Sequence, residues 1–287
     1  MIHKVFDILG VPLAPDKVVG PCQVITYLGI EIDSVNFVVR LPQDKFNDLM
    51  ASLMVWKGKR KCVKKDLLSL IGSLSFACKV VKCGRIFLRR LIDLSTTVRN
   101  LRHHISISSE SRKDIDWWCE FLPSWNGVAI IHTETLYSND IRLFTDASGI
   151  GLGGYYAGKW FSVPFNNSKN HSISFLELLA VVIAVFCWGD IWRDKQVILF
   201  TDNEAIVHIW RTGSCKCPNI MTLIRKLFFF TAQRNINLLL RHIPGKTNTY
   251  ADSLSRLQVE KFKVECKYVE AIATQLPQAM LHILRTL

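Results

Sequence analysis

The sequence predicts a mixed α/β (α+β) chain whose second half is a five-stranded mixed sheet flanked by helices. Three strand patterns follow one another at residues 141–146, 150–156 and 159–163. Helical and strand patterns then alternate, with strands at 196–201 and 236–242 and helices at 174–188, 203–212, 217–233 and 248–257. Three consecutive strands followed by this alternation imply a mixed sheet with helices against it.

The first 125 residues predict a different architecture. Two strand patterns at 23–32 and 35–41 are joined around Asp33-Ser34, and helical spacing follows at 44–56, 64–81, 84–94 and 109–122. The turn-forming cluster at 123–127 is a plausible domain boundary. We therefore expect four parts, at residues 1–42, 43–125, 126–260 and a helical tail at 261–287.

Composition and charge point to a globular chain with a polyanionic partner. Hydrophobic residues make up 49% and charged residues 21%, which excludes a mainly disordered chain. The net charge is +12, with the basic excess in both halves, so we expect nucleic acid rather than a membrane as partner. The eleven-residue apolar run Leu178–Trp188 is shorter than the roughly 20 residues of a membrane span and predicts a buried helix.

The N-terminus and the cysteines indicate the compartment. The first seven residues contain an acid and no apolar signal segment, and the nine cysteines form no disulfide framework. We expect an intracellular protein, in the cytoplasm or the nucleus.

Four acids occur where elements of the second half begin or end. Asp146 and Asp202 end strands in the repeated tripeptide Phe-Thr-Asp, Glu177 lies early in a helix, and Asp252 opens the last one. Hydrolysis of a phosphodiester by two metal ions about 4 Å apart needs carboxylates from separate elements. The set predicts a site for two Mg²⁺ or Mn²⁺ ions, which prefer oxygen ligands.

Each acid also has a structural interpretation. Asp146 and Asp202 could be turn residues, Glu177 could complete a capping box with Ser174, and Asp252 could interact with a helix dipole. The Phe-Thr-Asp repeat at two strand ends is hard to explain by turn chemistry alone. The metal interpretation is therefore favoured for the set.

These motifs resemble those of ribonuclease H domains. The resemblance rests on Phe144–Ser148 with the glycines after it, Glu177–Ala180, Phe200–Asn203 and the closing segment His242–Arg256. It implies a ribonuclease H-like fold and endonucleolytic cleavage of the RNA strand of an RNA–DNA hybrid. It assigns catalytic roles to Asp146, Glu177, Asp202 and Asp252, and to His242 in proton transfer or product release; His242 could instead be a solvent-facing strand-end residue.

Nucleic-acid contacts are expected at six further residues. Near the acids these are Asn203, Arg241 and Lys246, and in the densest cationic stretch of the first half they are Lys59, Arg60 and Lys61. The cations among them could equally be ordinary solvated charges. Gly149, Gly151, Gly153 and Gly154 fit no nucleotide-binding fingerprint and predict a closely packed hairpin.

The first half resembles the end of a reverse transcriptase palm and its thumb. The resemblance rests on residues 27–32, 41–45 and 70–74, and segments 9–21 and 76–85 resemble the DIRS class of tyrosine-recombinase retrotransposons. No Tyr-x-Asp-Asp turn occurs in the chain, so we expect it to begin after that motif and to lack polymerase activity. Asp114 and Asp116 are expected on a solvated helix face.

The resemblances together imply a retrotransposon reverse transcriptase and ribonuclease H fragment that acts on an RNA–DNA hybrid or another nucleic-acid duplex. The alternative is a catalytically inert, nucleic-acid-binding remnant of a transposable element. The sequence predicts no oligomeric state.

Overall fold

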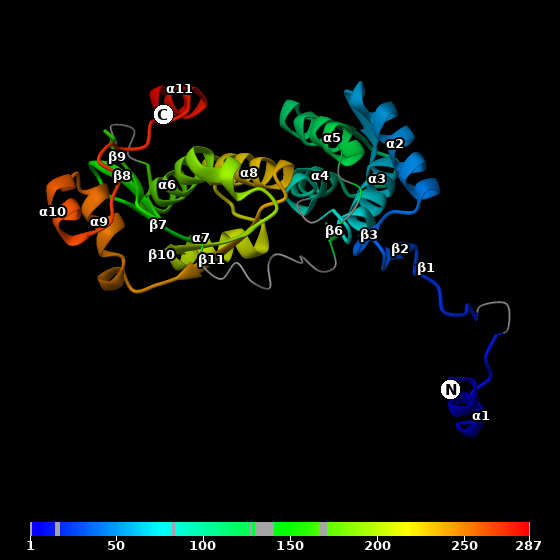
Figure 1. Ribbon diagram of the computed structural model, residues 1–287. Helices are drawn as coiled ribbons and strands as arrows, with labels where there is room; N and C mark the ends of the chain where they lie inside the picture. Colours follow the sequence, from blue (N-terminus) through cyan, green and yellow to red (C-terminus); the bar gives the residue numbers. More distant parts are fainter. Residues whose placement is uncertain are drawn as a thin grey trace.

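The chain folds around two main sheets, one in each half (Figure 1). The computed structural model describes residues 2–14, 18–81, 84–124, 126, 128–129, 141–166 and 171–286. Part of the predicted boundary cluster, residues 125 and 127, lies outside the described residues. The predicted α/β class with a five-stranded mixed sheet flanked by helices is confirmed.

The five-stranded sheet has the order β11-β10-β7-β8-β9. Strands β7 (Arg142–Ala147), β8 (Gly151–Tyr156) and β9 (Lys159–Pro164) pair antiparallel, as neighbours joined by short turns do. Strands β10 (Gln196–Thr201) and β11 (Asn237–His242) run parallel to β7, because helices connect them. The ends of β7, β10 and β11 therefore meet at one edge of the sheet.

Helix α6 (Ile173–Trp188) forms the centre of this half and is buried along most of its length, as the apolar run predicts. Together with the following turn η4 (Gly189–Trp192), the helix is long and apolar enough to cross a membrane. However, 72% of an 18-residue stretch of this segment is buried inside the protein. The other helical elements are α7 (Glu204–Thr212), α8 (Pro218–Gln233), η5 (Gly245–Thr247) and α9 (Thr249–Ser255).

The C-terminal segment is helical only in part. Helices α10 (Val259–Glu265) and α11 (Gln278–Thr286) are separated by residues that run beside β9. There the Glu270 N–H donates to Gly158 O (2.9 Å) and the Thr274 N–H to Trp160 O (2.7 Å). The predicted helical tail is therefore interrupted, because these backbone groups bond to the edge of the sheet instead of to each other.

The first half begins with helix α1 (Ile2–Ile8), which the sequence did not predict, followed by a four-stranded antiparallel sheet. Its strands are β1 (Val24–Tyr27), β2 (Ile30–Asp33), β3 (Val38–Arg40) and β6 (Val128–Ala129), in the order β1-β2-β3-β6. The single strand predicted over 23–32 is wrong. Leu28 (φ 48°) and Gly29 (φ 76°) make a two-residue turn with both residues at positive φ, which joins two strands in a hairpin.

Helices follow this sheet as predicted, except that the third predicted helix is divided into a 3-10 turn and a short α-helix and the second ends four residues early. They are α2 (Gln43–Lys57), α3 (Lys64–Ala77), η2 (Gly84–Phe87), α4 (Arg89–Ser95), α5 (Ser109–Phe121) and η3 (Leu122–Ser124). Between them β4 (Lys61–Val63) pairs with β5 (His104–Ser106). Asn126 bonds to both backbone groups of Leu41 (3.0 Å each), so the chain returns to the first sheet before it enters the second. The division into four parts stays a prediction.

Asp114 corrects one expectation in the first half. Its side chain on α5 is 1% exposed, so the predicted solvated position is wrong; Asp116 is half-buried. The Asp114 carboxylate lies 3.1 Å from Arg90 Nη1 and 3.4 Å from Arg225 Nε. Because Arg225 belongs to α8, this cluster joins the helices of the two halves.

Candidate metal centre

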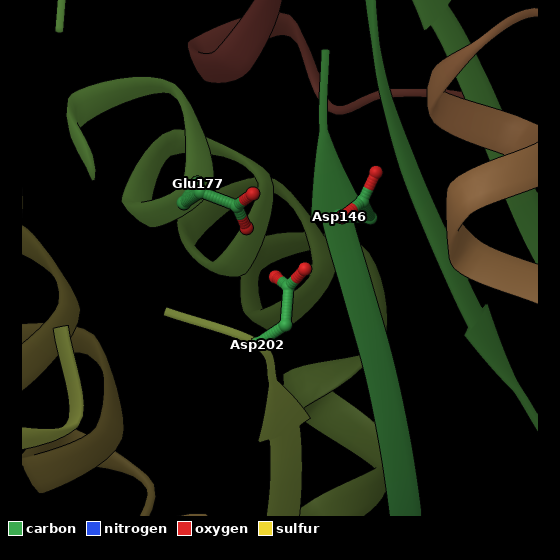
Figure 2. Close-up of side chains that lie close together, drawn as sticks. All are labelled: Asp146, Glu177 and Asp202. Atoms are coloured by element: carbon green, nitrogen blue, oxygen red, sulfur yellow. The ribbon is translucent and has the colours of Figure 1, made fainter. Parts of the chain in front are cut away.

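Asp146 and Asp202 come together because two parallel strands carry the same tripeptide in the same register. Phe144 on β7 pairs with Phe200 on β10, and their rings stack with centroids 5.0 Å apart. Side chains two residues apart lie on one face of a strand. The acid that follows each phenylalanine by two positions therefore stands next to its counterpart, as Figure 2 shows.

Glu177 reaches the same point from helix α6 (Figure 2). The helix begins after Ser172, whose Oγ accepts a hydrogen bond from the Phe175 N–H (3.3 Å). The capping box between Ser174 and Glu177 is therefore ruled out, since the helix starts two residues earlier than that motif requires. Ser174 Oγ instead accepts from Asn203 Nδ2 (3.2 Å).

The three carboxylates form a compact group of oxygen donors. Asp146, Glu177 and Asp202 each offer an oxygen atom within 4.8 Å of the other two. Asp146 is 6% exposed and Glu177 4%, whereas Asp202 is exposed, so the group is buried at its base and open on one side. In the part of the chain that the structure describes, no lysine or arginine forms an ion pair with any of the three.

The electrostatics of this group are unfavourable without a cation. Burial raises the pKa of Glu177 to about 9, and the charges of Asp146 and Asp202 act in the same direction against one backbone hydrogen bond from Ala147. Burial also raises the pKa of Asp146 to about 6, with further increases from Asp202 and Asp252. A divalent cation at this point would offset the repulsion.

An unpartnered donor atom supports the fit of a metal ion. Glu177 Oε2 is buried and has no hydrogen-bond partner within the described ranges. A buried carboxylate oxygen without a partner is costly, and carboxylate oxygens are the ligands that Mg²⁺ and Mn²⁺ favour. The donor set therefore suits a hard divalent ion.

Helix α9 completes the surroundings of Asp146. Ser255 is buried, and its hydroxyl donates a hydrogen bond to Asp146 Oδ2. Ser148 Oγ donates to the Ser255 carbonyl (2.7 Å), and Asn248 Nδ2 donates to the Thr145 carbonyl (3.0 Å), so both ends of α9 are tied to β7. The sequence interpretation assigned Ser255 no role. Its spacing of three residues after Asp252, one helical turn, was the available signal.

The glycines of β8 allow this approach. A Cβ on Gly153 would lie 2.5 Å from the Ser255 backbone nitrogen, and one on Gly151 would lie 2.6 Å from the Ser255 carbonyl oxygen. No side chain fits at either position without moving α9. The predicted close packing of the hairpin is found only at Gly154, where an added Cβ would meet Phe161 of β9; Gly151 and Gly153 pack against α9 instead, and a Cβ on Gly149 would have no described neighbour within 4 Å.

Asp252 and His242 lie nearby but outside the group of three. Asp252 Oδ1 accepts from Arg256 Nε (2.8 Å), while its charge raises the pKa of Asp146. His242 ends β11 opposite Thr201, and its Nδ1 lies 3.8 Å from Glu204 Oε1. Their metal-binding and catalytic roles stay predictions.

The predicted nucleic-acid contacts are distributed over both halves. Asn203 caps α7, since its Oδ1 accepts from the Ile206 N–H (3.2 Å). Arg241 and Lys246 are exposed. Arg241 pairs with Phe200, two residues before Asp202, and Lys246 follows Gly245, where an added Cβ would lie 3.0 Å from Asp202 Oδ2. The remaining three lie in the other half, where the Lys59 ammonium stands over the Trp56 ring (4.8 Å) and Arg60 and Lys61 are exposed.

No protein-family model matches the chain, and no curated protein matches it by sequence. Among solved structures, it is similar to the RNase H1 of the halophilic archaeon Halobacterium salinarum NRC-1, with 14% identity and a TM-score of 0.35 over 42% of this chain and 98% of that one. It is also similar to LC11-RNase H1, isolated from compost by a metagenomic approach and solved in complex with an RNA/DNA hybrid, with 22% identity and a TM-score of 0.32 over 42% and 98%.

A third similar structure is the foamy viral protease-reverse transcriptase dRH in complex with double-stranded DNA. The identity is 16% and the TM-score 0.36, over 84% of this chain and 42% of that one. Similarity of this size does not decide what the chain does, so its function rests on the geometry of the site.

Proposed function

We propose that this chain is a metal-dependent endonuclease of the ribonuclease H type that cuts the RNA strand of RNA–DNA hybrids. One observation carries the proposal: carboxylates from two strand ends and one helix converge, two of them buried and one exposed, and no lysine or arginine of the described residues forms an ion pair with them. This is the donor arrangement that metal-assisted phosphodiester hydrolysis requires. The motif resemblance of residues 144–256 supports the same chemistry.

The proposed roles follow from position. Asp146, Glu177 and Asp202 would hold Mg²⁺ or Mn²⁺, with Asp252 as a further ligand of a two-ion site. A divalent metal bound there supplies a water of lowered pKa and neutralises charge on the phosphate. Ser255 fixes the Asp146 carboxylate, and His242 would move a proton or assist product release from the open side.

The substrate is proposed from charge and from the chemistry of RNA. A chain of net charge +12 is suited to a polyanion. Selection of the RNA strand would depend on contacts to 2′-hydroxyl groups in the wide minor groove of the hybrid. We further propose that residues 1–42 and 43–125 correspond to a palm end and thumb of a retrotransposon reverse transcriptase in an intracellular setting.

Cleavage of an end-labelled hybrid tests the proposal. The chain should cut only the RNA strand with Mg²⁺ or Mn²⁺ present, and EDTA should stop the reaction. Asp146→Asn and Asp202→Asn should each lower the rate by at least ~100-fold, since even residues that only orient metal ligands cost 10–100-fold. The matched control is Glu260→Gln, at an acid whose side chain is 90% exposed on α10, which should cut like the parent.

The alternative is an inert nucleic-acid-binding remnant. It is supported if the parent binds the hybrid but cuts neither strand with either ion. Cleavage by both aspartate variants at the parent's rate would instead show that the activity belongs to a contaminant or to another site.

A further inference from the structure

A groove of about 860 Å³ lies between the two halves of the molecule. One wall is the end of α3 with η2, and the other is the C-terminal end of α7 with α8. At Gly213 an added Cβ would lie 3.0 Å from the Ile86 side chain, so the two walls meet at this point. The groove is therefore built from both halves.

The groove is cationic. Lys79, Arg85 and Arg211 line it, and its described lining contains no acidic residue. All three are exposed, and none forms an ion pair with a carboxylate of the described segments. Helix α7 ends here with a partial charge of about −0.5, which three full positive charges outweigh. Such a cluster attracts a polyanion, because bound anions relieve the repulsion among the cations.

Aromatic contacts hold the walls in place. Trp210 stacks on Phe228 with ring centroids 3.8 Å apart, and its Nε1 donates to the Leu238 carbonyl (3.0 Å). On the opposite wall the Lys79 ammonium stands 4.9 Å from the centre of the Phe76 ring. Trp210 and Phe228 also line the groove, so a rigid apolar surface lies beside the cations.

Helix α7 connects this groove to the carboxylates. It starts two residues after Asp202 and ends in the groove, and its nine residues span about 14 Å at 1.5 Å each. A nucleic-acid strand advances about 3.4 Å per nucleotide along a duplex axis. A strand that runs along α7 from the carboxylates would therefore reach the groove after roughly four nucleotides.

We propose that this groove holds the sugar-phosphate backbone of the hybrid about four nucleotides from the bond that is cut. The inference rests on the proposed function and adds to it a second, metal-independent contact that joins both halves to one strand.

Affinity measurements test the charge requirement. The variant with Lys79→Gln, Arg85→Gln and Arg211→Gln keeps the aliphatic stems and loses three charges, as does the control with Arg193→Gln, Lys261→Gln and Lys267→Gln at exposed positions outside the groove. Hybrid binding in EDTA should weaken by about tenfold or more in the groove variant, and the slope of log affinity against log salt should shrink by about one per cation. Equal affinities and slopes for the two variants would overturn the proposal.

The position of the contact is tested with a set of hybrids. Each hybrid carries a single neutral methylphosphonate, placed in turn at one of the first eight linkages from the cleavage site, in either strand. For the parent, loss of affinity should centre on about the fourth linkage. In the groove variant that position-specific loss should disappear. A loss that persists in the groove variant, or that is equal at all linkages, would overturn the placement. Thermal unfolding midpoints near the parent's would show that the variants fold.

The two proposals fail separately. If the chain binds the hybrid through the groove but never cuts it, the groove proposal is supported and the proposed nuclease function is contradicted. If the parent cuts the hybrid and the groove variant binds it with unchanged affinity, the nuclease function is supported and the groove proposal is contradicted.

Discussion

The buried Asp114 and the carboxylate group of Asp146, Glu177 and Asp202 differ in the charges that surround them. Asp114 lies against Arg90 and Arg225, whose charges lower its pKa while burial raises it to about 6. At Glu177 burial and the neighbouring carboxylates act in the same direction, and the pKa reaches about 9. The protein balances the first group with its own arginines. In the second, Arg256 only partly offsets the carboxylate repulsion at Asp146 and forms its ion pair with Asp252, so among the described residues no arginine or lysine pairs directly with Asp146, Glu177 or Asp202. This separates a structural cluster from one suited to bind an ion.

The largest expected effect is on the structural cluster. Asp114→Ala leaves the Arg225 guanidinium, 12% exposed, without its carboxylate and should lower the free energy of unfolding by about 3–5 kcal/mol. Urea denaturation measures this loss. The matched control is Asp190→Ala, whose ion pair with Arg234 (2.7 Å) involves an acid that is 68% exposed and should cost at most about 1 kcal/mol. Equal losses would remove the distinction between buried and exposed pairs.

A divalent metal ion should stabilise the folded protein through Asp146, Glu177 and Asp202 and not through the Asp114 cluster. At Mg²⁺ or Mn²⁺ concentrations of 100 Kd, the free energy of unfolding should rise by about 2.7 kcal/mol in the parent. Asp146→Asn should reduce that gain, whereas Asp190→Asn should keep it. Thermal unfolding with and without EDTA gives the answer. A parent insensitive to both ions would contradict the metal centre.

Glu177→Gln tests the repulsion in the metal-free protein. Folding raises the pKa of Glu177 from 4.5 to about 9, so between these pH values the folded state binds more protons than the unfolded chain. The stability of the parent should therefore fall as pH rises through this range. Because glutamine cannot ionise, the free energy of unfolding of the variant should fall less over this pH range. Each unit of pKa shift corresponds to about 1.4 kcal/mol.

The measurement is urea denaturation in EDTA at pH 5 and pH 8. Glu177→Gln should be more stable than the parent at pH 8 and close to it at pH 5, and it should not cut the hybrid. A variant with normal cleavage and the same pH dependence as the parent would place Glu177 outside the site.

The smallest effect concerns Ser255. Ser255→Ala removes the hydroxyl that holds Asp146 Oδ2, which should cost about 1 kcal/mol of stability and roughly tenfold in metal affinity. Ser253→Ala is the control, because that hydroxyl is buried on the same helix and has no hydrogen-bond partner among the described residues. Matching metal affinities in the two variants would show that the Ser255 contact is dispensable.

Sequence patterns predicted the carboxylates because their positions depend on local rules. A strand-end acid in each of two parallel strands, and an acid early in a buried helix, are placed by periodicity and strand order alone. Asp114 was misplaced because the partner that buries it, Arg225, is far along the chain. Ser255 was missed for a similar reason, since its contact with Asp146 spans 109 residues.

The prediction of a single strand over residues 23–32 was wrong for a different, local reason. Residues 23–32 are continuous in β-forming character, and only the backbone at Leu28 and Gly29 shows the turn. Glycine tolerates positive φ, but leucine rarely adopts it, so Leu28 gave no turn signal.

The packing of α9 on Gly151 and Gly153 of β8 decides when the contact with Asp146 can form during synthesis. Helix α9 reaches Asp146 only across Gly151 and Gly153, and Ser255 is translated 109 residues after Asp146. At 5–20 residues per second, roughly 5–20 s separate the two on the ribosome. During that interval the nascent chain gains Glu177 and then Asp202 before it has the helix that fixes Asp146, so the three carboxylates reach their final arrangement only after Ser255 has been made.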